Sequence, residues 1–78
     1  MIDNDLKQQI DRAISENKNL GALWDILRDF KLNGGDQQVA LDTLQSMREG
    51  ASEDYEDRIL EVMDFASGWC QPSSRIWP

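Results

Sequence analysis

The sequence predicts an all-α fold, a compact bundle of about four short helices with an aromatic C-terminal tail packed back on it. Four segments repeat apolar residues at the three- and four-residue spacing of a helix. Glycines or helix-capping residues separate these segments, and no segment alternates apolar and polar residues as a strand does. The short connections favour neighbouring helices, packed either antiparallel or orthogonally. Because 78 residues suffice for one domain, we expect a single helical domain over 1–78.

The first helix is expected over 4–15, with Asp3 or Asn4 as its N-cap. Its inward face is formed by Leu6, Ile10, Ala13 and Ile14. The spacing of these four residues stacks them on one side of the helix, so this side should join the core.

The second helix is expected over 20–32, where one apolar face comprises Leu20, Leu23, Trp24, Leu27 and Phe30, widened by Ile26. Asn33-Gly34-Gly35 should end it, because glycine accepts the left-handed backbone that closes a helix. Gly21 disfavours the helix by about 1 kcal/mol relative to alanine. It therefore marks either the cap itself or a close approach between two backbones.

The third helix is expected from Asp36 or Gln37 to Glu49, with Asp36 as N-cap and Gly50 as its stop. Its inward residues are Ala40, Leu41, Leu44 and Met47. The fourth helix should follow the N-cap Ser52 and continue to Ser67. Its inward residues are Tyr55, Ile59, Val62, Met63 and Ala66.

The C-terminal tail begins after Gly68, and Pro72 prevents continuation of the last helix. The tail carries two of the three tryptophans, Trp69 and Trp77, together with Ile76. Burial of these large apolar side chains should hold the tail against the helices.

Charge and composition narrow the class of partner. Fifteen acidic and eight basic residues give a net charge of −7, which disfavours nucleic acid and anionic membranes and favours a basic partner. The alternative is that this charge only keeps the protein soluble. No apolar run is long enough to span a bilayer, and the first residues lack the features of a signal peptide. We therefore expect a cytoplasmic protein that is a monomer when free.

Catalytic and metal-binding chemistry find little support in the sequence. The chain has no histidine and a single cysteine, Cys70, so it lacks the commonest general base and the usual zinc ligands. Carboxylate pairs such as Asp25 and Asp29 fall on polar helix faces, where they should remain ordinary solvated acids. The prediction is a binding protein without enzymatic activity, metal or cofactor.

The fourth helix carries the most informative pattern. At about 100° per residue, Glu53, Asp57, Glu61 and Asp64 lie within about 80° of one another, opposite the apolar face. Like charges at this spacing disfavour the helix in the free protein, so a stripe of them suggests a docking surface for a basic partner. We expect Asp54 and Glu56 to contribute at its flanks. The alternative interpretation is a solvated helix face without a partner.

The segment 57–70 (DRILEVMDFASGWC), followed by 75–77 (RIW), resembles small bacterial immunity proteins of polymorphic toxin and contact-dependent growth inhibition systems. The earlier segment 23–27 (LWDIL) adds to this resemblance, which otherwise covers only the last third of the chain. It implies a protein that binds one cognate toxin domain, often a basic nuclease, and blocks it. The resemblance assigns no individual binding residue.

The leading hypothesis is therefore an immunity protein that neutralises a basic toxin domain by occlusion. The alternative is a helical adaptor or regulatory subunit that docks another protein through an apolar patch, anchored by Trp69, Ile76 and Trp77. Salt separates these alternatives, because electrostatically steered association slows as ionic strength rises whereas apolar docking barely responds.

Overall fold

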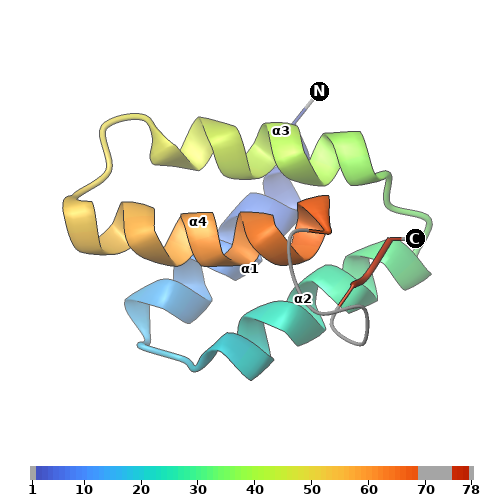
Figure 1. Ribbon diagram of the computed structural model, residues 1–78, viewed down its shortest axis with the longest axis horizontal. Coiled ribbons are helices and arrows are strands. Elements are labelled where there is room, and N and C mark those ends of the chain that lie inside the picture. The colour runs from blue at the N-terminus through green and yellow to red at the C-terminus, as the bar shows by residue number, and fades with distance from the viewer. Residues whose placement is uncertain (1, 69–74, 78) are drawn as a thin grey trace.

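Four α-helices form in the order that the sequence predicts (Figure 1). The computed structural model describes residues 2–68 and 75–77. The helices are α1 (Asn4–Ser15), α2 (Leu20–Leu32), α3 (Gln37–Arg48) and α4 (Glu53–Ser67). No strand occurs in the described part of the chain, so the predicted all-α class is confirmed.

Each helix begins at a side chain that accepts a backbone N–H from its first turn. The four N-caps are Asp3, Asn19, Asp36 and Ser52. Each such bond typically contributes about 1 kcal/mol to helix stability. Because Asn19 caps α2, Gly21 is not a cap. Nor is Gly21 a close backbone contact, since the nearest atom to an added Cβ would be Asn19 Oδ1 at 3.4 Å.

Helices α3 and α4 lie side by side and run in opposite directions (Figure 1). Helix α1 contacts α2 and α3, and α2 also contacts α4. Ile76 and Trp77 lie near the C-terminal end of α2. This arrangement leaves one long side of α4 without a helix packed on it.

All four helices contribute buried residues to one apolar core. The helical members are Leu6, Ile10, Ala13, Leu23, Leu27, Ala40, Leu44, Met47, Ile59, Val62 and Ala66, and Ile76 joins them from the tail. The other residues predicted to face inward, such as Ile14, Leu41 and Tyr55, are partly buried and pack against this core. Full burial of one such aliphatic side chain contributes about 1.5–3 kcal/mol, so the core is the main source of stability.

The described end of the tail packs against α2 and the loop that follows it. Ile76 is 5% exposed, and its carbonyl oxygen accepts a hydrogen bond from Lys31 Nζ at 2.6 Å. The Trp77 ring meets Phe30 edge-on with 6.3 Å between centroids. Trp77 Nε1 donates to the Gly35 carbonyl oxygen at 3.4 Å. The predictions for Trp69 and Cys70 fall on 69–74, outside the described residues.

Candidate functional site

One side of α4 is acidic and exposed along the length of the helix. It carries Glu53, Asp54, Asp57, Glu61 and Asp64, which we call the α4 acidic face. The opposite side of α4 buries Ile59, Val62 and Ala66 completely. The helical period explains the separation, because residues three, four or seven apart share a side. The structure thus brings together on one exposed side five of the six carboxylates that the sequence predicts as partner-binding.

The α4 acidic face is not neutralised by the protein's own cations. None of its carboxylates forms an ion pair with another residue in the described ranges 2–68 and 75–77. Arg58, the one basic residue of α4, instead donates to Asn17 Oδ1 at 3.4 Å. Each like-charge pair at a spacing of four disfavours the helix by a few tenths of a kcal/mol. This repulsion opposes the stability of the free protein, although the helix dipole favours Glu53 and Asp54 in the first turn.

Glu56 does not belong to this face. Its side chain is half-buried, and its Oε2 lies 3.4 Å from Arg48 Nε at the end of α3. The Arg48 N–H is not aimed at this oxygen, so the contact is an ion pair without a hydrogen bond. Glu56 thus ties α4 to α3, whereas its predicted contribution to binding remains untested.

Leu60 adds an apolar contact to the acidic surface, and sequence reasoning missed it. Leu60 is 37% exposed. A single exposed leucine is ordinary on a protein surface, so Leu60 matters here only through its position among the carboxylates. Leu60 lies three residues after Asp57 and four before Asp64, so carboxylates flank it on the helix. The helical spacing could have indicated this position, because Leu60 falls outside the apolar face predicted for α4.

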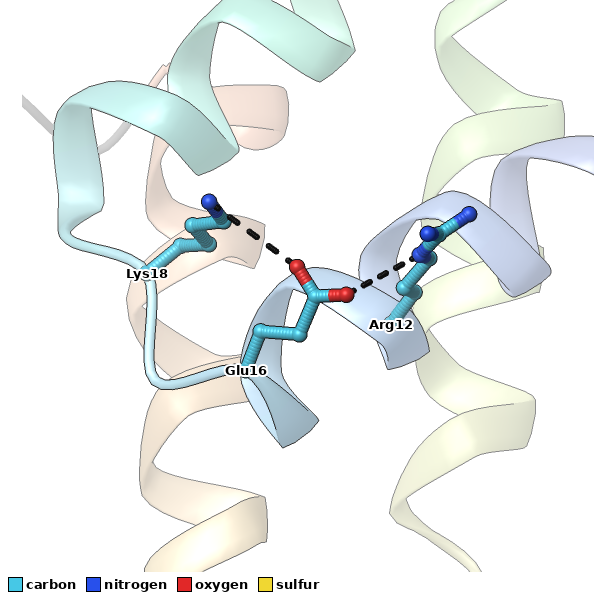
Figure 2. A network of polar contacts seen from close by, with 3 residues as sticks. All are labelled: Arg12, Glu16 and Lys18. Carbon is cyan, nitrogen blue, oxygen red and sulfur yellow. Dashed lines mark hydrogen bonds and ion pairs between the residues drawn. The ribbon is translucent and has the colours of Figure 1, made fainter.

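Arg12 of α1 and Lys18 of the following loop are both paired with Glu16 (Figure 2). Arg12 Nε donates to Glu16 Oε2 at 3.0 Å, and Lys18 Nζ lies 3.8 Å from Glu16 Oε1. The hydrogen bond from Arg12 lowers the pKa of Glu16, and the charges of Arg12 and Lys18 lower it further. This pairing keeps two of the few positive charges away from α4.

A second acidic region is concave. The start of α1, the end of α2 and the following loop enclose about 530 Å³ lined by Asp3, Asp5, Asp29 and Asp36, among others. Asp3 and Asp36 use their carboxylates as helix caps. Within the described part of the chain, no three histidine, cysteine or carboxylate side chains are grouped to hold a metal ion. No helix in that part is long and apolar enough to cross a membrane.

The arrangement can bind a basic surface through charge, with Leu60 as an apolar contact at its centre. Comparison of the chain with models of known protein families, with curated proteins and with solved structures finds no match.

Proposed function

We propose that this protein is an immunity-type inhibitor, which binds a basic toxin domain through the α4 acidic face and neutralises it by occlusion without catalysis. One observation carries the proposal: five exposed carboxylates share one side of a helix and have no cationic partner in the described chain. Basic nuclease surfaces hold phosphates and attract carboxylates for the same reason. The resemblance of 57–70 to bacterial immunity proteins supports this class of partner.

The proposed complex forms in two physical steps. The field of the carboxylates first steers the basic domain toward α4, which raises the association rate. Leu60 then loses its contact with water against the partner, which slows dissociation. Occlusion needs no reactive group, so the inhibitor remains chemically unchanged.

Charge reversal on α4 tests this proposal. The tagged protein is used at low salt to capture its partner from source cells, and the captured protein is identified and purified. The variant Glu53→Lys, Asp57→Lys and Glu61→Lys should slow association by roughly tenfold or more, because steering is lost. Stopped-flow or surface plasmon resonance measurements at several salt concentrations should show that the variant loses most of the salt dependence.

A control with equal net charge makes the test specific to this surface. Asp5→Lys, Asp29→Lys and Glu49→Lys change exposed residues on other parts of the molecule. Both triple variants change the net charge from −7 to −1, since each reversal adds two positive charges. We expect the control to retain most of the affinity. If both triple variants lost the same affinity, the change in net charge would be the cause, and a binding role of α4 would be contradicted.

The test also separates the adaptor alternative. A partner that stays bound at high salt and is indifferent to both triple variants would indicate docking through an apolar surface. Ile76, one of the anchors predicted for that alternative, is buried in the core and cannot serve as a surface contact without movement of the tail.

A further inference from the structure

A hollow lies beside the α4 acidic face, between the start of α2 and the end of α4. It is an open depression of about 640 Å³, lined by the apolar residues Leu20, Ala22, Trp24 and Phe65, by Gly21, and by the polar residues Asn19 and Asp25. Trp24 and Phe65 are half-buried, and both line the hollow while they also pack against the core. Cavities of about 300–1,000 Å³ with a mainly apolar wall are typical of binding pockets.

Gly21 keeps this hollow open although the helix does not require a glycine there. Its backbone is not left-handed, and the one atom near an added Cβ would be Asn19 Oδ1, at the ordinary contact distance of 3.4 Å. An alanine would therefore fit and would favour the helix by up to about 1 kcal/mol. Gly21 lines the same hollow as Trp24 and Phe65, so a side chain longer than alanine at this position should take up part of its space. The physical effect of the glycine is thus to leave room in the wall.

The charges around the hollow connect it to the α4 acidic face. Phe65 follows Glu61 by four residues, so the two side chains are neighbours on α4 and the face borders the hollow. On the α2 side, Arg28 lies 4.0 Å from Asp25 and 5.3 Å above the centre of the Trp24 ring. Arg28 and Asp25 offset each other there, whereas Glu61 and Asp64 have no such partner in the described chain. Arg58 lies three residues before Glu61 and donates to Asn17 Oδ1, so it brings one positive charge to this side of α4. Because Glu61 and Asp64 outnumber it, a group entering from the α4 side still meets net negative charge.

We propose that this hollow receives one large apolar side chain of the basic partner, and that lysine or arginine residues beside that side chain pair with Glu61 and Asp64. Apolar contacts at the centre and charges at the rim are the usual division of roles in a protein interface. The acidic rim decides the chemistry of the occupant, since an acidic or neutral segment would gain nothing from Glu61 and Asp64. The inference rests on the proposed function and specifies the residue class that the partner presents.

Filling the hollow tests the inference without loss of the fold. The probe is a library of random peptides displayed on phage, selected against the immobilised whole protein. We expect selected peptides to carry leucine, methionine or an aromatic residue beside lysine or arginine. Gly21→Met should weaken these peptides by about tenfold or more, as loss of a central apolar contact does. Gln8→Met, which adds the same side chain at an exposed position of α1 outside the hollow, should leave their affinity unchanged.

Two further measurements keep the test independent of folding defects. Circular dichroism should show that Gly21→Met unfolds at a temperature no lower than the wild type, because the glycine is removed from a helix. In the wild type, a bound peptide should shift the NMR signals of the Trp24 indole N–H and the Phe65 amide. A peptide that leaves both signals in place would place its site elsewhere and overturn the inference.

The outcomes distinguish the hollow from the acidic face. Binding that survives Gly21→Met but weakens when Glu53, Asp57 and Glu61 are reversed would overturn the hollow alone. Selection of peptides without basic residues, or of none above background, would overturn the predicted occupant. The proposed function fails separately, when the partner captured from cells is indifferent to the reversed face.

Discussion

At the scale of single residues, Gly35 controls how the loop after α2 packs. A Cβ on Gly35 would lie 2.5 Å from the Phe30 carbonyl oxygen and would overlap the Phe30 ring. The ring could rotate, but the carbonyl belongs to the last turn of α2 and cannot. Gly35→Ala should therefore lower the free energy of unfolding by about 1–3 kcal/mol, as overpacking does. Urea unfolding followed by circular dichroism measures this change.

Gly21→Ala is the matched control for that substitution, because the same methyl group meets no overlap there. We expect it to raise the free energy of unfolding slightly. If both alanine variants shifted stability in the same direction, the close contact at Gly35 would not be the cause.

Thr43 shows what residue-level reading of the sequence cannot supply. The predicted buried face of α3 omitted it because threonine is polar, yet Thr43 is completely buried. Its hydroxyl donates to the Val39 carbonyl oxygen at 2.7 Å and accepts from the Asp3 backbone N–H at 2.9 Å. A buried hydroxyl is tolerated when it is bonded in this way. The second partner lies 40 residues away in the chain, so no local pattern could indicate it.

At the scale of elements, the sequence predicts helices well because capping and periodicity are local. Ser52 and the apolar spacing of Ile59, Val62 and Ala66 define α4 without reference to any other helix. The same helical period predicts that Glu53, Asp57, Glu61 and Asp64 lie on the exposed side. The pairing of Glu56 could not be predicted from α4 alone, because its partner Arg48 belongs to a neighbouring helix.

Helices α1 and α4 are joined by a hydrogen bond that should make stability fall in alkali. The Tyr55 hydroxyl donates to Asp11 Oδ1, and burial together with this bond and the Asp11 charge raises the pKa of Tyr55 above its ordinary value of 10.0. The neutral phenol is therefore favoured in the folded state. This contribution is fully present below about pH 10 and is lost as the pH rises through the higher folded-state pKa.

Tyr55→Phe removes that contribution and tests it. At about pH 8 the variant should be less stable by about 1 kcal/mol, the usual effect of one lost hydrogen bond. The difference should narrow by about pH 11, because the wild type alone loses the tyrosine contribution. Urea unfolding of both proteins at the two pH values provides the measurement, and the titration of lysines affects both alike. A difference independent of pH would contradict the role of this tyrosine.

At the scale of the whole molecule, the distribution of charge matters more than its sum. Several cations contact other groups of the same protein: Lys31 binds the Ile76 carbonyl oxygen, and Arg12 binds Glu16 on the surface. The α4 acidic face is left with repulsion that a basic partner would relieve. The hollow beside it could not be foreseen from the sequence, because it forms only where 20–25 of α2 meets Phe65 of α4.

Neutralising part of the α4 acidic face should therefore stabilise the free protein while it weakens the complex. In Asp57→Asn, Glu61→Gln and Asp64→Asn, the i,i+3 and i,i+4 repulsions disappear, as does a carboxylate near the negative end of the helix dipole. Glu53 is retained because it lies in the first turn, where the dipole favours it. We expect the free energy of unfolding to rise by about 0.5–1 kcal/mol at low salt.

Salt reveals whether repulsion is the cause of that gain. Exposed charges are largely screened over distances beyond about 3 Å at 1 M salt, so the gain should shrink there. Thermal unfolding by circular dichroism, run on both proteins at about 0.01 M and 1 M sodium chloride, makes the comparison. A neutralised protein that is less stable than the wild type at low salt would mean that these carboxylates support the fold. In that case, repulsion among the carboxylates would not support a binding role of the α4 acidic face.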